Sequence, residues 1–379
     1  MSRASSLAIF THFEKLTDPR IERTQAHKLL DILTIALCAT ICGANAWTDV
    51  ERFGLAKQEW FAKFLELPGG VPSHDTFGRV FALLDTAEFE ACLRSWLRSL
   101  NKSMKGQGIA IDGKTLRHSF DQATGRAALH SVSAWAVGLR LSLGQVAVDD
   151  KSNEITAVPK LLELLEISGA VVTLDAMHCQ TATAAAIQAK QADYVLNVKA
   201  NQPKLLERLQ QVFEHYVNLD FKAPGLRVHK TTEHSHGREE RREYYVAPAP
   251  KDLLEAGQWS GLQSVVMVYR HRDVAGTETD EVHYYISSLP PKVKRLAKAI
   301  RDHWGIENSL HWVLDVVFAE DDSRIRKGNG PETTATLRRL ALSILEQDTS
   351  LKSSLRGKRL QAGWNNNLLA RILTGFSGN

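Results

Sequence analysis

Short apolar segments alternate with helical segments between residues 105 and 217, and this alternation constrains the fold more than any other feature. The stretches "GQGIAIDGK" and "GAVVTLDAMHC" predict strands that end at Asp112 and Asp175. Residues 128–150 predict two more strands with a turn near Gly138, and helices are expected between the later strands. The resulting order, β-β-β-α-β-α-β-α, predicts an α/β fold whose sheet is covered by helices on both faces.

The chain divides into five regions by pattern. Residues 1–104 predict a helical N-terminal domain, and residues 105–217 the first part of the α/β core. Residues 218–290 are polar and rich in strand-forming residues, which indicates a β-rich insertion. Residues 291–327 predict a helix that completes the core, and residues 328–379 predict a basic, helical C-terminal tail.

The N-terminal region contains two short helices in residues 73–102, which begin with the capping residue Ser73 and are separated near Asp85. Two helices joined by a short turn are compatible with DNA binding, but such pairs are equally common in protein cores. Both interpretations stay open on the sequence alone.

Composition limits the class of protein. The chain has 379 residues, of which 44% are hydrophobic, so a sizeable core and two or three domains are expected. A net charge of +4 permits a nucleic-acid partner without requiring one. The four cysteines form no CxxC pair, which favours reduced structural thiols and a cytosolic protein. The longest apolar run, residues 32–47, is shorter than the ~20 residues of a membrane span, so no membrane partner is expected.

One carboxylate is placed unusually in the helix predicted for residues 301–322. At 100° per residue, Glu307 falls at the centre of an apolar stripe. The stripe consists of Leu296, Ile300, Trp304, Leu310, His311, Leu314 and Phe318. A charge that faces a core is costly unless it is paired or binds a metal ion. Glu307 therefore requires a partner from elsewhere in the chain.

Asp112 and Asp175 are candidates to share that partner. A right-handed crossover would place their two strands side by side, with both carboxylates at one edge of the sheet and Glu307 above them. Each aspartate alone could simply cap the next turn. Together the three hard oxygen ligands suit two Mg²⁺ ions, for which Mn²⁺ could substitute, in metal-assisted phosphoryl transfer.

These residues also carry a resemblance. The strand order with two aspartates and a late helical glutamate resembles the ribonuclease-H-like fold of DDE transposases and integrases. Short stretches of the sequence are similar to the H-repeat-associated transposases of bacterial insertion sequences, over essentially the whole chain. The stretches that carry this similarity are "DPR", "HKLLDILTIALCATICGA", "PSHDTFGRVF", "AIDGKTLRHS", "LHSVSAW", "DKSNEI", "TLDAMHCQ", "ADYVLNVKANQ", "YYISSL" and "HWGIENSLHWVLDVVFAED".

The resemblance implies a mixed sheet flanked by helices, with Asp112, Asp175 and Glu307 as catalytic and metal-binding residues. It further implies a DNA endonuclease and strand transferase that acts on terminal inverted repeats and target DNA as a homodimer. Such an enzyme would work in the bacterial cytoplasm at the nucleoid. The relatives often carry a Tyr, an Arg and a Lys around the glutamate, whereas this chain has Ile300, His303 and Leu314 there.

Several other residues have a functional and a structural interpretation. Arg301 or His303 could take over phosphate binding from the missing arginine. Other candidates for DNA contact are Lys114, Arg117, Lys199, Asn201 and Gln202. The three positive charges could equally be solvated, and "NQP" is also a typical helix start.

Further residues compete for roles near the predicted metal site. Glu320, Asp321 and Asp322 are rivals of Glu307, and Asp315 could support the site or be solvated. His178 and Glu154 are interpreted mainly as helix-start residues, and Trp304 and Trp312 as core residues. Two other functions stay open: a catalytically inert DNA-binding relative, and a metal-dependent nuclease that never joins strands.

Overall fold

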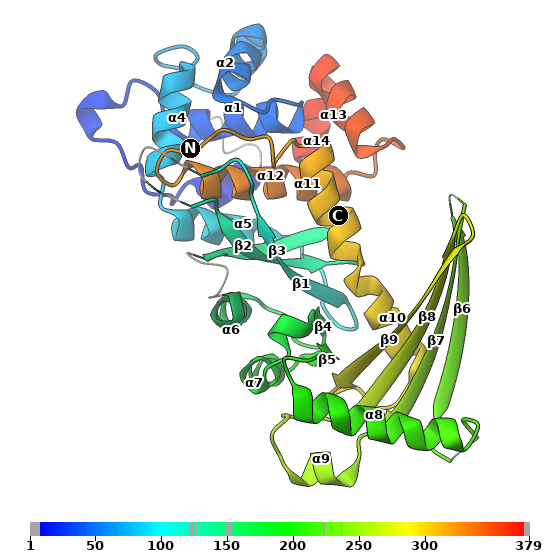
Figure 1. Ribbon diagram of the computed structural model, residues 1–379. Helices are drawn as coiled ribbons and strands as arrows, with labels where there is room; N and C mark the ends of the chain where they lie inside the picture. The colour runs from blue at the N-terminus through cyan, green and yellow to red at the C-terminus, as the bar shows by residue number, and fades with distance from the viewer. Residues whose placement is uncertain are drawn as a thin grey trace.

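The computed structural model describes residues 8–374 apart from 121–124, 126, 149–153, 223 and 236. The described residues form one nine-stranded mixed sheet in the order β3-β2-β1-β4-β5-β9-β8-β7-β6 (Figure 1). The strands are β1 (Gly108–Thr115), β2 (His130–Ala136), β3 (Leu141–Val148), β4 (Val171–Leu174), β5 (Asp193–Val198), β6 (Arg227–Ser235), β7 (Arg238–Pro248), β8 (Ser264–Val274) and β9 (Thr277–Ser287).

The first five strands confirm the predicted ribonuclease-H-like order. β1 pairs antiparallel with β2 and parallel with β4, and β4 pairs parallel with β5. β1 runs three residues past Asp112, so the prediction that this strand ends at Asp112 was too short. Side chains alternate between the faces of the sheet, because Ile109 and Ile111 join one buried cluster and Ala110 joins another.

Helices cover both faces of this core. α6 (Glu154–Leu164) and α7 (Thr181–Ala189) pack on the face that carries Ile109, and α8 (Pro203–Asn218) follows β5. The opposite face packs against α5 (Thr86–Ser99) and α12 (Gly330–Gln347).

The N-terminal and C-terminal helices form one helical body, visible above the sheet in Figure 1. Its N-terminal elements are the short η2 (Ala8–Phe13) and η3 (Glu22–Thr24), α1 (Leu29–Ile41), α2 (Trp47–Ala56), α3 (Gln58–Phe61), α4 (His74–Leu83) and α5. Ser73 caps α4 as predicted, by accepting a hydrogen bond from the Thr76 amide. α12, α13 (Leu355–Trp364) and α14 (Asn366–Thr374) pack into the same core.

This packing places much of the positive charge of the C-terminal tail in the interior. Arg338, Arg339, Lys358 and Arg359 are buried. Lys358 donates to the main-chain carbonyl of Leu345, and Arg339 pairs with Glu320. Four of the seven Lys and Arg side chains of residues 328–379 are therefore buried, and three of these four meet carboxylates or carbonyls in the interior.

The insertion extends the sheet. β9 pairs antiparallel with β5, and β8, β7 and β6 follow outward as a long wing beside α10 (Val293–His303) (Figure 1). The short α9 (Lys251–Glu255) joins β7 to β8. α10 contacts β1 of the core and β7 of the insertion, so it packs against both parts of the sheet.

The helix predicted for residues 291–327 is interrupted and shorter. α10 ends at His303, a π-helical turn follows at Glu307–His311, and α11 ends at Val316 (Trp312–Val316). Leu296 and Ile300 are buried as predicted, but Glu307 is exposed. Leu296 and Ile300 contact the core, whereas Glu307, farther along the helix, lines an open pocket and does not face the interior.

Trp304 and Trp312 were predicted as core residues, and this was wrong. Their exposed fractions are 43% and 56%. Trp304 caps the end of α10, where its ring contacts the Arg270 guanidinium of β8. Trp312 follows the π turn, which holds more residues per turn than an α-helix and so shifts the positions after it around the helix axis. Among the described helices, none is both long and apolar enough to cross a membrane.

Candidate active site

A pocket of about 400 Å³ brings together Asp112, Asp175 and Glu307. Its walls come from β1, β4 and β5 of the core, from β7, β8 and β9 of the insertion, and from α10 with the π turn. The three carboxylates predicted as a set therefore line one pocket.

The two aspartates are neighbours because of the parallel ladder between β1 and β4. Ile111 pairs with Leu174, so the next residue of each chain segment, Asp112 within β1 and Asp175 just after β4, lies at the same level of the sheet. Burial, and secondarily the charge of Asp175, raises the pKa of Asp112 to about 6. Asp175 Oδ1 is buried and has no hydrogen-bond partner among the described residues. Two neighbouring carboxylates, one of them with a buried oxygen that lacks a hydrogen-bond partner, are a donor set that fits Mg²⁺ or Mn²⁺.

Glu307 lines the same pocket from a different element. It is the first residue of the π turn, a feature that often marks functional sites in helices. Among the described residues, no three or more His, Cys, Asp or Glu side chains are grouped as a finished metal site. Glu307 thus shares the pocket with the aspartate pair, and the described residues do not form a compact three-carboxylate cluster.

A buried acid with two imidazoles lies behind the aspartates. Glu154 is 3% exposed, with one carboxylate oxygen 3.1 Å from His130 Nε2 and the other 3.3 Å from His178 Nε2. His178 Nε2 is also 3.7 Å from Asp175 Oδ1. Burial opposes ionisation of Glu154, but the hydrogen bonds from His130 and His178 outweigh it and lower its pKa to about 2.

The sequence analysis did not assign this group to the site, because Glu154 and His178 were interpreted mainly as helix-start residues. Gly113 shows why the group fits here. A Cβ at Gly113 would lie 1.9 Å from Glu154 Oε1. The glycine after Asp112 therefore makes room for the acid behind the site, and "DGK" was the available signal.

A second imidazole group faces Asp112 directly. His311 Nδ1 lies 3.6 Å from Asp112 Oδ2. Burial, followed by the charges of Arg339 and Lys114, lowers the pKa of His311 to about 3. The ring beside Asp112 is consequently neutral at physiological pH.

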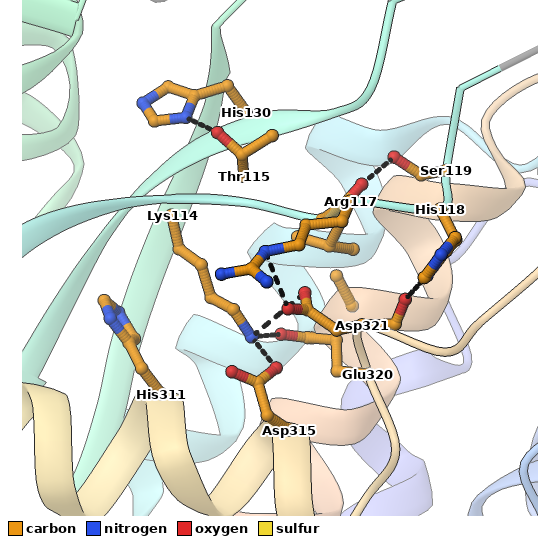
Figure 2. Close-up of polar contacts among 12 residues, drawn as sticks. Lys114, Thr115, Arg117, His118, Ser119, His130, His311, Asp315, Glu320 and Asp321 are labelled. Atoms are coloured by element: carbon orange, nitrogen blue, oxygen red, sulfur yellow. Dashed lines mark hydrogen bonds and ion pairs between the residues drawn. The ribbon is translucent and has the colours of Figure 1, made fainter.

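The rivals of Glu307 do not line the pocket. Figure 2 shows Asp315, Glu320 and Asp321 around the Lys114 ammonium instead. Glu320 is buried, and its Oε2 accepts a hydrogen bond from Lys114 Nζ at 2.9 Å. Asp315 pairs with the same ammonium, and Asp321 Oδ1 lies 3.8 Å from it. These acids serve Lys114, so Glu307 is the late carboxylate that reaches the aspartates' pocket.

The residues predicted to contact DNA take different positions. Lys114 is 9% exposed and neutralised, which does not favour the predicted phosphate contact. Arg117 is exposed, with Nε 3.5 Å from Asp321 Oδ2. Lys199 is exposed at the pocket rim, where a phosphate could reach it.

Asn201 and Gln202 hold the turn that follows Asp175. The side-chain amide of Asn201 donates to the Ala176 carbonyl at 2.7 Å, and that of Gln202 to the Cys179 carbonyl at 2.9 Å. This turn is the short helix η5 (Ala176–His178). The helix-start interpretation of "NQP" therefore describes these contacts, and any DNA contact would use the remaining amide atoms.

Arg301 and His303 also line the pocket but have protein partners. Arg301 makes a two-pronged pair with Glu233, at 3.0 and 2.9 Å, and His303 Nδ1 lies 3.0 Å from Thr173 Oγ1. Burial lowers the pKa of His303. Both side chains are held by protein partners, so any contact with a phosphate would use Arg301 Nη1 or His303 Nε2.

Sequence reasoning missed the contribution of the insertion to this pocket. Arg242, Tyr244, Arg270, His283 and Tyr285 line it from β7, β8 and β9. The Arg270 guanidinium stacks 5.3 Å from the ring centre of Trp304. The alternation of side chains along these strands identifies the residues that share one face of the sheet. The pairing of β9 with β5 is needed to show that this face borders the site.

Comparison with known families decides what this pocket belongs to. The family profile described as "Transposase DDE domain" matches residues 103–344, and the profile described as "DDE_Tnp_1-associated" matches residues 10–97. The chain belongs to the DDE transposase family. The matched range contains the three pocket carboxylates of this transposase domain.

The similarity to individual proteins extends over nearly the whole chain. The protein named "H repeat-associated putative transposase YhhI", from Escherichia coli K12, is 39% identical over 97% of this chain and 98% of its own length. "Putative transposase YncI", from Escherichia coli O157:H7, is 37% identical over 98% of this chain and 95% of its own length. These relatives confirm the resemblance to H-repeat-associated transposases.

Similarities that cover a short part of the chain, or that have low sequence identity, add little to this family assignment. "Inactive transposase YbfQ", from Escherichia coli K12, is 36% identical over 19% of this chain and 86% of its own length. A piggyBac transposase synaptic complex with hairpin DNA aligns with 99% of this chain and 76% of its own chain, at a TM-score of 0.46 and 12% identity. That likeness is too slight to inform the chemistry of the DDE transposase pocket.

Proposed function

We propose that this protein is a DNA transposase that cleaves the ends of its insertion sequence and joins each freed 3′-hydroxyl to target DNA. The observation that carries the proposal is the meeting of Asp112, Asp175 and Glu307 at one pocket in a chain of the DDE transposase family. The transposase family supports the coarse function, and the pocket supports the chemistry.

The chemistry consists of two phosphoryl transfers. In the first, a water molecule gives up a proton as its oxygen bonds to the scissile phosphorus, and the bond from phosphorus to the 3′-oxygen breaks. That oxygen takes up a proton and leaves as a 3′-hydroxyl. In the second, the freed 3′-oxygen bonds to a target phosphorus and displaces the target's own 3′-oxygen. One phosphodiester replaces another, so neither a nucleotide cofactor nor a covalent Ser or Tyr intermediate is needed.

Asp112 and Asp175 would hold the divalent cations, two Mg²⁺ for which Mn²⁺ could substitute, and Glu307 would close the site from the π turn. When bound, the cations activate the attacking oxygen and stabilise the leaving oxygen. The buried Asp175 Oδ1, which lacks a hydrogen-bond partner, and the raised pKa of Asp112 support this assignment. A bound cation would be a partner for Oδ1 and would favour the ionised form of Asp112. Exposed Lys199 at the rim would neutralise a backbone phosphate.

The partners follow from the reaction. The enzyme would recognise terminal inverted repeats and a target duplex, in the bacterial cytoplasm at the nucleoid. Two ends must be cut together, so two copies of the chain would assemble on DNA.

The test is cleavage of a labelled duplex that carries the element's own terminal repeat, in Mg²⁺, in Ca²⁺ and in EDTA. We expect Mg²⁺-dependent nicking at the 3′ end and a strand-transfer product when target DNA is added. Glu307→Gln should lower the nicking rate more than about 100-fold while DNA binding is kept. The matched control is Asp322→Asn, an exposed acid of the same segment that lies outside the pocket, and it should cleave like the wild type.

Each rival has its own outcome. Specific binding without cleavage in any metal would point to an inert DNA-binding relative. Nicking without a strand-transfer product would point to a nuclease. Nicking that survives in Glu307→Gln would remove Glu307 from the site.

A further inference from the structure

We propose that Lys114 is a positioning residue that fixes the Glu307-bearing helix against the strand of Asp112, and that it is not a DNA contact. The proposal rests on the proposed function, because positioning matters only if the three carboxylates act together. It assigns a role to a buried ion-pair cluster that the phosphoryl-transfer chemistry itself does not use.

Lys114 and Asp112 share a face of β1. They are two residues apart in a strand, so their side chains project to the same side. That side meets α11 and the segment that follows it. Lys114 pairs there with Asp315 of α11, 201 residues away in the chain, and with Glu320 beyond the helix end (Figure 2).

Burial makes this contact persistent. The Glu320 side chain is fully buried, and Arg339 of α12 donates to its other oxygen at 3.0 Å. Removing one partner from a buried pair leaves an uncompensated charge, which is far more costly than losing an exposed pair. The Lys114 ammonium would have to abandon two carboxylates to reach a phosphate, so it stays with the helix.

The helix is also held on the other side of the π turn. His303 of α10 contacts Thr173, which lies two residues before Asp175 on β4. Glu307 therefore lies between two anchors. His303 contacts the strand that leads to Asp175, and Asp315 pairs with Lys114 on the strand of Asp112. The Lys114 anchor sets how close the π turn comes to Asp112, and a misplacement of about 1 Å at a reacting centre can cost about 100-fold in rate.

The test separates positioning from DNA contact by two measurements on the full chain. The first is the salt dependence of affinity for the terminal-repeat duplex in Ca²⁺. The second is the single-turnover nicking rate in Mg²⁺ at saturating DNA. We expect Lys199→Ala to weaken binding and to reduce the salt slope by about 1, as the loss of one phosphate contact does. Lys114→Met should leave affinity and slope unchanged and lower the nicking rate about 10- to 100-fold.

Lys114→Met leaves Glu320 without one partner and could fail to fold, so a milder variant is needed. Asp315 is 32% exposed, and Asp315→Asn leaves the pairing of Lys114 with Glu320 intact. We expect Asp315→Asn to lower the nicking rate about 10-fold at unchanged affinity and unchanged melting temperature. Lys114→Arg should recover part of the rate, and Asp322→Asn is the matched exposed control.

The outcomes are distinct. A lower salt slope in Lys114→Met would make Lys114 a DNA contact and overturn the proposal, as would wild-type nicking in Asp315→Asn. If the wild type never nicks in any metal, the proposed function fails instead, while the salt slopes still report whether Lys114 touches DNA.

Discussion

The two halves of the pocket are built by different means. Asp112 and Asp175 are placed by a backbone ladder, because the pairing of Ile111 with Leu174 sets their positions at the same level of the sheet. Glu307 is placed by side chains, through the contact of His303 with Thr173 on one side and of Asp315 with Lys114 on the other.

The difference shows what each half depends on. Shifting a ladder requires breaking many main-chain hydrogen bonds, so the aspartate pair is insensitive to any single side chain other than its own supports. A helix anchored by a few ion pairs depends on each of them. The strand half should therefore respond to changes in packing, and the helix half to changes in charge.

The largest expected effect on stability tests the helix half through Glu320. Burial opposes its ionisation, but Arg339 and then Lys114 outweigh it and lower its pKa to about 2, from 4.5 in the unfolded chain. A lowered folded pKa stabilises the protein fully above about pH 4.5, and the contribution is lost as pH falls towards 2. The shift corresponds to at most about 3 kcal/mol.

Denaturant unfolding of wild type and Glu320→Gln at several pH values measures this contribution. We expect the variant to be less stable by about 3 kcal/mol at pH 7, and the gap to close as pH falls from 4.5 towards 2. Asp322→Asn is the exposed control and should show no such gap. A gap that does not change with pH would mean that the ionised Glu320 does not anchor the helix region.

The next effect tests the strand half through Gly113. A Cβ there would lie 1.9 Å from Glu154 Oε1 and 3.0 Å from His130 Nε2. Gly113→Ala should therefore cost about 1–3 kcal/mol through overpacking. Thermal or denaturant unfolding measures it, with Gly363→Ala as control, since a Cβ at Gly363 meets only ordinary contacts at 3.6 Å and beyond.

A double variant sharpens this second test. Glu154→Ala removes the oxygen that the new methyl group would strike. Gly113→Ala should then cost clearly less in the Glu154→Ala background than in the wild type. Equal costs in both backgrounds would show that the glycine is not reserved for the acid behind the aspartates.

The sequence predicted the strand half better than the helix half, for a physical reason. Strand order and the two aspartates follow from local patterns and from the handedness of crossovers, so β1, β4 and their adjacency could be predicted, whereas their exact register could not. The π turn and the pairing of Lys114 with Asp315 depend on contacts between distant segments, which no local period carries. The same limit explains why Trp304 was predicted in the core and why the burial of Arg339 in the basic tail was not predicted.

The insertion gives a second example. Its strands were expected from composition, but their pairing with β5 was not, because an edge-to-edge join leaves no trace in either segment alone. For that reason the pocket residues of β7, β8 and β9 escaped notice. Charge alternation along these strands was the available signal, and it could not tell which face meets the site.

The smallest expected effect concerns the pair of Arg301 with Glu233, the exposed counterpart of the buried Lys114 cluster. The side chains are 40% and 39% exposed. Hydrogen bonding between them raises the pKa of Arg301 and lowers that of Glu233. Water and salt screen such a pair, so Glu233→Gln should cost no more than about 1 kcal/mol, and less at high salt. Urea unfolding at low and high salt measures it. If Glu233→Gln destabilised the protein as much as Glu320→Gln, the helix would be anchored equally through the insertion, and the contrast between a buried and an exposed anchor would not hold.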